Sequence, residues 1–234
     1  ICLLGTNCGL EDPDDVAKMN EIANDLGVDS IELGATIAVL MDAGKGGFGD
    51  VSFMREVTSE MMAGSEIGKF YASGTARVGE ALSLKRVPVI KKQAISAYDP
   101  RLIEVTGISM MLSAQGADHT VGNNATFKCD DKNIEELVAE SLRMQINAAV
   151  ADSLGLCVFG RSVTDENLEL ISNAINDAFD AGVTPDFIRK IGLETLRLEA
   201  AFNKTAGFDE EDDELPSFFL DEPLPPTDKM ARLR

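Results

Sequence analysis

Apolar residues recur along this chain every three or four positions, the spacing that places them on one face of an α-helix. After Pro13, the residues Val16, Met19 and Ala23 follow this spacing, and acidic residues fill the first turn, where the helix dipole favours them. This pattern predicts a first helix that ends at Gly27. The same spacing predicts further helices near residues 30–42, 53–71, 74–83 and 102–114.

Three more helices are predicted in the second half of the chain. A long one runs from about Asn133 to Asp152, and its apolar face is formed by Ile134, Leu137, Val138 and Ala148. Capping residues indicate the other two helices. One starts at Thr164 as N-cap and ends at Gly182; the next has Thr184 as N-cap, Pro185 at its first position, and Gly207 at its end.

Two stretches interrupt the helical pattern. Residues 87–98 form an extended segment, and Pro100 disfavours helix at Asp99. We therefore predict a partial helical middle domain at residues 1–95 and a C-terminal helical domain at residues 96–234. The acidic run 209–214 and the prolines after it predict a tail that is extended over the surface or partly disordered. The predicted fold class is all-α, or mostly α, with two helical domains.

Composition narrows the possible functions. The net charge of −19, with 40 acidic residues and no Lys/Arg cluster, argues against nucleic-acid binding. No apolar run approaches the length of a membrane span, and the four scattered cysteines lack CxxC spacing, so we expect a cytoplasmic protein without a disulfide framework. The chain begins without Met on the apolar run Ile1–Leu4, and we expect that another segment preceded it.

The segment Asp152-Ser153-Leu154-Gly155-Leu156-Cys157 is the most informative for chemistry. A helix end that runs into a glycine turns the chain sharply, exposes backbone N–H groups and places Asp152 and Cys157 on one side of a tight loop. A thiolate there could bind iron, and the carboxylate could hold the N–H groups of a ligand. On spacing alone, a helix cap followed by a buried cysteine is the preferred interpretation.

A similar pattern, Asn24-Asp25-Leu26-Gly27-Val28-Asp29, occurs earlier in the chain. Two such loops in one chain favour a pseudo-symmetric pair that grips one extended ligand. The only histidine, His119, lies in the polar turn Gly116–Thr120, where general acid–base chemistry and a solvent-facing role are equally compatible with the residues.

Four ordered motifs resemble the aldehyde ferredoxin oxidoreductase family, and the resemblance spans essentially the whole chain. They are Leu4–Gly9, Ala97–Arg101, Gly116–Thr120 and Asp152–Cys157. The tail from Phe202 to Pro226 is also similar to that of the family. The resemblance implies the C-terminal helical portion of an enzyme with a tungsten or molybdenum bis-pterin cofactor and a 4Fe–4S cluster.

The resemblance also implies roles for individual residues. The loop with Asp152 and Leu156 would contact one pterin, and Cys157 would be the fourth ligand of the cluster. Asn24 and Asp29 would contact the other pterin, although the family has Asp at the first of these positions and Leu in place of Val28. His119 would move protons near the metal, and Cys8 would lie close to it without an assigned role.

The implied reaction is oxidation of a small aldehyde to a carboxylic acid, with electrons passed through the cluster to ferredoxin. The three other cluster cysteines, a catalytic glutamate and a β domain of the family would lie in a missing N-terminal part of the same enzyme. A homodimer is possible, but a metal between subunits is not supported because His119 is the only histidine.

Two other interpretations remain open at this point. One is the catalytic subunit of a tungsten-dependent benzoyl-CoA reductase, which shares the superfamily. The other, from a different class, is a cofactor-free all-α fragment with an interaction role. A C-x-x-C-x-x-x-C segment and a β domain encoded immediately upstream would distinguish the enzyme from the fragment.

Overall fold

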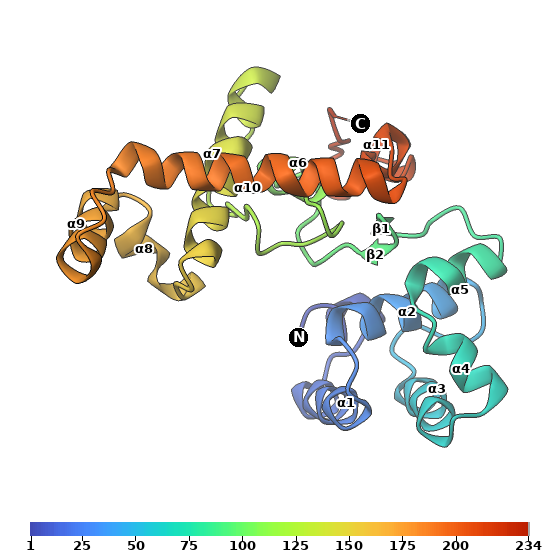
Figure 1. Ribbon diagram of the computed structural model, residues 1–234. Helices are drawn as coiled ribbons and strands as arrows, with labels where there is room; N and C mark the ends of the chain where they lie inside the picture. The colour runs from blue at the N-terminus through green and yellow to red at the C-terminus, as the bar shows by residue number, and fades with distance from the viewer. Residues whose placement is uncertain (234) are drawn as a thin grey trace.

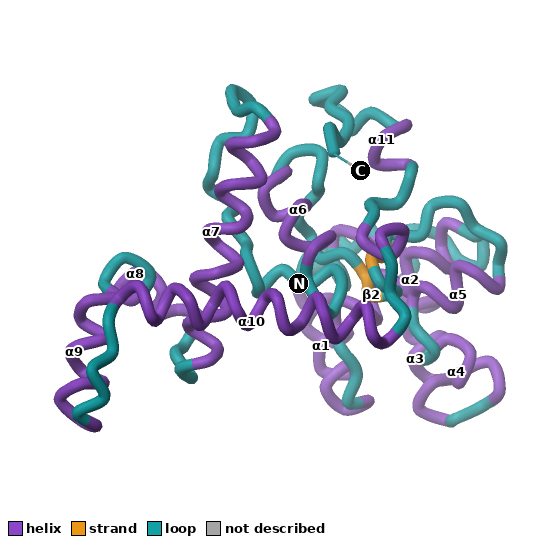
Figure 2. The backbone as a smooth tube through the Cα atoms, turned by 45° about the horizontal axis from the view of Figure 1, so that its top comes forward, coloured by secondary structure: helices purple, strands orange, loops and turns teal. Residues whose placement is uncertain are grey.

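The computed structural model describes residues 1–233, apart from the side chain of Ser162, and its regular secondary structure is almost entirely helical (Figure 1). Arg234, the last residue of the predicted second domain, lies outside the described residues. Figure 2 shows that strands are confined to one small hairpin, which confirms the mostly-α prediction. Among the described residues, no helix is both long and apolar enough to cross a membrane.

The first part of the chain forms a cluster of five helices after a short 3-10 turn, η1 (Thr6–Cys8). The helices are α1 (Pro13–Leu26), α2 (Ser30–Asp42), α3 (Val51–Ala63), α4 (Glu66–Tyr71) and α5 (Thr75–Ala81). The most buried helix is α2, on which eight residues are buried. Its side chains, among them Ile37 and Leu40, form one core with Leu4, Met19 and Met54. This core draws only on residues 4–84.

A two-stranded antiparallel hairpin follows, β1 (Val89–Ile90) and β2 (Gln93–Ala94). The remaining helices are α6 (Glu104–Leu112), α7 (Ile134–Ser153), α8 (Arg161–Thr164), α9 (Leu168–Phe179), α10 (Pro185–Ala206) and α11 (Phe218–Asp221). The long helices α7 and α10 cross each other (Figure 1). They approach closely at Gly192, where an added Cβ would lie 2.6 Å from the carbonyl oxygen of Ile146.

The C-terminal tail is part of the second core, which corrects the prediction of a surface arm or partial disorder. Leu215, Phe218 and Phe219 are buried against α6 and the hairpin. Arg232 donates two hydrogen bonds to the buried Glu104 at the start of α6, with distances of 2.7 and 2.5 Å. Burial of three large apolar side chains outweighs the disorder that the neighbouring acidic run favours.

Two helix predictions near the middle and end of the chain were wrong. The helix expected at 53–71 is divided into α3 and α4, because Gly64 adopts a left-handed conformation (φ 62°) that ends α3. Thr164 is not an N-cap: it lies inside the one-turn α8, and α9 begins after Asn167. By contrast, Thr184 caps α10 as predicted, since its hydroxyl accepts the amide of Phe187.

The buried face of α7 also differs from the prediction. Leu137 and Ala148 are buried, but Ile134 and Val138 are exposed. The buried face also carries Ser141 and Gln145, whose side chains bond to each other, and Ser141 bonds in addition to Ser109 of α6. A fully bonded polar group can occupy a helix interface, so the apolar spacing alone identified only Leu137 and Ala148 of the buried face correctly. The predicted boundary between residues 95 and 96 remains a prediction.

Candidate functional site

The two glycine turns singled out in the sequence have the same backbone structure. At the end of α1, the amide of Gly27 bonds to the carbonyl of Asn24, and the amide of Val28 bonds to that of Ala23. At the end of α7, Gly155 and Leu156 repeat this pattern toward Asp152 and Ala151. Both sets of bonds form the Schellman motif, in which a left-handed glycine closes the helix. The glycine φ angles are 69° and 67°.

The similarity extends to the residue two positions after each glycine. Asp29 has φ −64° and ψ 128°, and Cys157 has φ −67° and ψ 134°. Both residues are exposed. An added Cβ at Gly27 or Gly155 would meet no atom within 4 Å, so both turns face open space. The two turns therefore share one local backbone geometry, which Gly44 and Gly207 also adopt, and the pseudo-symmetric pair that grips one ligand stays a prediction.

The histidine turn is held by Asp118, which is buried. One carboxylate oxygen of Asp118 accepts the backbone amide of Thr120 at 2.7 Å and its hydroxyl at 2.8 Å. This local bonding fixes the turn between them and leaves His119 half-buried. The imidazole of His119 stacks on the ring of Tyr98, with centroids 5.7 Å apart and an interplanar angle of 28°.

Asp29 and His119 line the same cavity, although they lie 90 positions apart. The cavity has a volume of about 280 Å³ and is formed by the start of α2, by β2 and by the histidine turn. Its polar lining includes Glu32, Gln93 and Asp118. The structure therefore brings one of the two glycine turns together with the histidine.

The second glycine turn is not part of this cavity. Its connection to the histidine turn runs through Arg161, which follows the Cys157 loop and donates a hydrogen bond of 3.3 Å to the carbonyl oxygen of Thr120. Leu156 is half-buried, while Asp152 and Cys157 are exposed. The pKa of Glu199 is raised, first by the burial of its carboxyl group and then by the negative charge of Asp152. Glu199 lines a larger cavity of about 760 Å³ between α7, α10 and the acidic segment.

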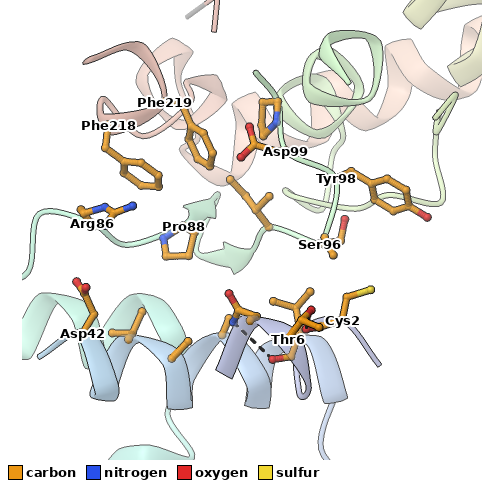
Figure 3. Close-up of a pocket in the computed structure, with 18 of the residues that line it drawn as sticks. Cys2, Thr6, Asp42, Arg86, Pro88, Ser96, Tyr98, Asp99, Phe218 and Phe219 are labelled. Carbon is orange, nitrogen blue, oxygen red and sulfur yellow. Dashed lines mark hydrogen bonds between the residues drawn. The ribbon is translucent and has the colours of Figure 1, made fainter. Parts of the chain in front are cut away.

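A third cavity, of about 390 Å³, lies between the N-terminal turn with α2 and the segment 86–101 with α11 (Figure 3). Cys2, Thr6 and Asp42 lie on one side, and Tyr98, Asp99, Phe218 and Phe219 on the other (Figure 3). Because Tyr98 lines this cavity and stacks on His119, the aromatic pair separates it from the cavity that contains Asp29.

Cys8 behaves differently from Cys157. Its thiol is fully buried and lies within hydrogen-bonding distance of the carbonyl oxygens of Leu3 and Gly34, at 3.3 and 3.4 Å. Burial raises the pKa of Cys8 to about 12, so it stays a thiol at neutral pH. Within the described part of the chain, no group of three or more His, Cys, Asp or Glu residues is arranged to hold a metal ion.

Sequence reasoning missed two residues that organise the site. Glu32 is a first-turn glutamate, and Arg161 is a single basic residue after the Cys157 loop; neither stands out from ordinary surface positions in the sequence. Tyr98 was part of a motif, but only the structure shows its ring against His119.

Comparison with known proteins places the chain in a family. The family described as aldehyde ferredoxin oxidoreductase, domains 2 and 3, matches residues 1–233. The tungsten-containing aldehyde ferredoxin oxidoreductases of Pyrococcus horikoshii and Pyrococcus furiosus are 28% and 27% identical, over 95% of this chain and 40% of their own length.

An aliphatic sulfonate oxidoreductase, WOR-like subunit, of Pyrococcus furiosus is 26% identical over 95% of this chain and 37% of its own length. The chain thus spans about two fifths of the length of the relatives it matches. Its sequence, its helical architecture and its paired glycine turns lead to one conclusion: the chain belongs to the aldehyde ferredoxin oxidoreductase family, in the region of domains 2 and 3.

Proposed function

We propose that this chain is the helical part of a tungsten or molybdenum bis-pterin oxidoreductase that oxidises aldehydes to carboxylic acids and passes electrons through a 4Fe–4S cluster to ferredoxin. The observation that carries the proposal is the pair of Schellman turns, each of which presents a candidate ligand-binding residue beside open space. The family match over residues 1–233 supports it.

The side chains at these turns fit the implied groups. Asp152 is an exposed carboxylate, suited to accept hydrogen bonds from the N–H groups of a pterin. In the first turn, Asn24 is exposed, and one oxygen of Asp29 is used to cap α2 through the amides of Ile31 and Glu32. Cys157 is exposed, so its sulfur is accessible as a thiolate ligand of iron.

The overall reaction converts an aldehyde and water into a carboxylic acid, two protons and two electrons. When bound, the metal–pterin group and the cluster supply the redox chemistry of this conversion. The chain supplies the surroundings: Asn24, Asp29, Asp152 and Leu156 hold the pterins, and Cys157 anchors the cluster. His119 exchanges a proton at a ring nitrogen, as a general acid or base does.

The cavities support a small apolar substrate. The 390 Å³ cavity has aromatic side chains from Tyr98, Phe218 and Phe219 (Figure 3), and the ring of Tyr98 stacks on the imidazole of His119. Such a lining favours burial of an apolar substituent. A small aldehyde with an aliphatic or aromatic side chain suits this volume.

The test uses His119→Asn in the complete enzyme. We expect turnover to fall by roughly 10²–10⁴-fold with tungsten and pterin content unchanged, since Asn keeps some hydrogen bonding but cannot titrate. Thr126→Ala, an exposed change in the same inter-helix loop, is the control. Near-normal turnover with full cofactor would make His119 a bystander, and loss of pterin would make it structural.

Cys157→Ala tests the cluster in the same enzyme. We expect the electron paramagnetic resonance signal of a 4Fe–4S cluster to be lost or converted, and reduction of ferredoxin to stop. The matched control for the spectrum is Cys2→Ala, which removes the other exposed thiol; because Cys2 lines the 390 Å³ cavity, only its cluster signal is compared and not its turnover. An unchanged spectrum in Cys157→Ala would remove this residue from the proposed ligand set.

A further inference from the structure

Glu32 occupies an unusual place for a first-turn glutamate. Its side chain does not extend into solvent but lines the 280 Å³ cavity between Asp29 and His119. One carboxylate oxygen accepts the amide of Thr75 at 2.7 Å, and the other accepts the amide of Ala94 at 2.9 Å. One side chain therefore joins three separate segments: α2, α5 and β2.

The bond to Thr75 compensates for a missing cap. Thr75 is the first residue of α5, and its N-cap, Gly74, has no side chain to accept a first-turn amide. Glu32 performs this role from 43 positions away. The hydroxyl of Thr75 returns a bond of 3.3 Å to the carbonyl oxygen of Glu32. The spacing between α2 and α5 is thus fixed from both sides.

The bond to Ala94 connects Glu32 to the histidine turn. Ala94 pairs with Val89 in the hairpin, and the histidine turn lies directly against this hairpin at Gly116. An added Cβ at Gly116 would lie 2.4 Å from the carbonyl oxygen of Ile90, so the histidine turn and the hairpin are in close contact at this point. Two positions later, Asp118 fixes the turn that carries His119.

A continuous path of bonds and contacts therefore runs from the first glycine turn to the histidine. Asp29 caps the same helix on which Glu32 lies three positions later, the carboxylate holds the hairpin, and the hairpin supports the turn. We propose that Glu32 is a positioning residue that sets the location of His119 relative to Asp29. Its relevance to catalysis rests on the proposed function; its effect on geometry does not.

The test uses the fact that His119 is the only histidine of the chain. With histidine labelled with ¹³C at Cε1 alone, the imidazole of His119 gives one ¹H–¹³C signal, which the stacked ring of Tyr98 makes sensitive to position. In Glu32→Gln, the side-chain carbonyl oxygen can still accept one backbone N–H, but the NH2 group is a donor and cannot accept the other, so one of the two bonds is lost. We expect the His119 signal to shift and the unfolding temperature to fall by about 3–6 °C.

The matched control is Glu66→Gln, another first-turn glutamate, whose side chain is exposed on α4 and pairs with Lys69. It loses the same favourable interaction with a helix start but has no connection to the hairpin. We expect its His119 signal to match that of the wild-type chain. Should Glu32→Gln fail to fold, Glu32→Asp replaces it, because the shorter side chain keeps the charge and cannot span both amides.

A lower unfolding temperature with an unmoved His119 signal would overturn the proposal and leave Glu32 as a stabilising residue only. In the complete enzyme, we expect Glu32→Gln to lower kcat about 10-fold with cofactor content and KM little changed, since the reacting geometry is affected rather than binding. If His119→Asn proves catalytically silent while Glu32→Gln still moves the signal, the proposed function fails and the positioning role stands.

Discussion

Replacement of Gly155 by Ala isolates the backbone requirement of the second glycine turn. At φ 67°, an L-residue with a Cβ costs about 1–2 kcal/mol relative to glycine. No atom lies within 4 Å of the added Cβ, so steric overlap contributes nothing further. For a chain of this size, the unfolding temperature should fall by about 2–4 °C per kcal/mol. Gly155→Asn should cost less, because Asn tolerates the left-handed region.

Two glycines outside the turn calibrate this estimate. Gly64 has φ 62° and open space, so Gly64→Ala should match Gly155→Ala in a urea or thermal titration. Gly116 has φ 98° and would place its Cβ 2.4 Å from the carbonyl oxygen of Ile90, so Gly116→Ala should cost clearly more. In the complete enzyme, Gly155→Ala should reduce the pterin content, whereas Gly64→Ala should leave it unchanged. Equal stability of Gly155→Ala and the wild type would refute the left-handed turn, and equal pterin content would refute its role as a cofactor loop.

Two further predictions concern titrating groups. In the native chain free of iron, an aromatic disulfide reagent should modify the exposed Cys2 and Cys157 rapidly, while the buried Cys8 and Cys129 react only on unfolding; a third fast thiol would contradict the structure. Burial, and then the charge of Asp152, raise the pKa of Glu199 above its ordinary value of 4.5. Ionised Glu199 therefore lowers the free energy of unfolding at pH values above the raised pKa, and this effect is absent below pH 4.5. Glu199→Gln should therefore raise the unfolding temperature at pH 8 but not at pH 4, and an equal gain at both pH values would contradict this.

Local sequence rules located most helices because caps and glycines act locally. Thr184 and Gly207 delimit α10 as predicted, since both act through bonds within a few positions. Local sequence rules could not predict which face of α7 is buried. Ser141 and Gln145 are buried through bonds that include Ser109, a residue 32 positions from Ser141, so their polarity gave no sign of burial. Apolar Ile134 and Val138 are exposed instead.

The same distinction applies to the candidate site. The two glycine turns depend on backbone bonds within six residues, so their similarity was visible in the sequence. The cavity shared by Asp29 and His119 depends on Glu32 and on the close contact of Gly116 with the hairpin, which are both long-range. Only the tertiary structure could reveal that one turn faces the histidine and the other does not.

The integration of the tail into the second core has a consequence for how the chain folds during synthesis. The core of residues 4–84 is complete once the hairpin begins, so it can form while later residues are still on the ribosome. The second core cannot form at that stage, because α6 packs against Phe218 and Phe219 and bonds to Arg232, which are synthesised last. Arg232 lies 128 positions after its partner Glu104. Until that large loop closes, the part of α6 that the tail buries is exposed to aggregation or to a chaperone, although α7 already covers another part.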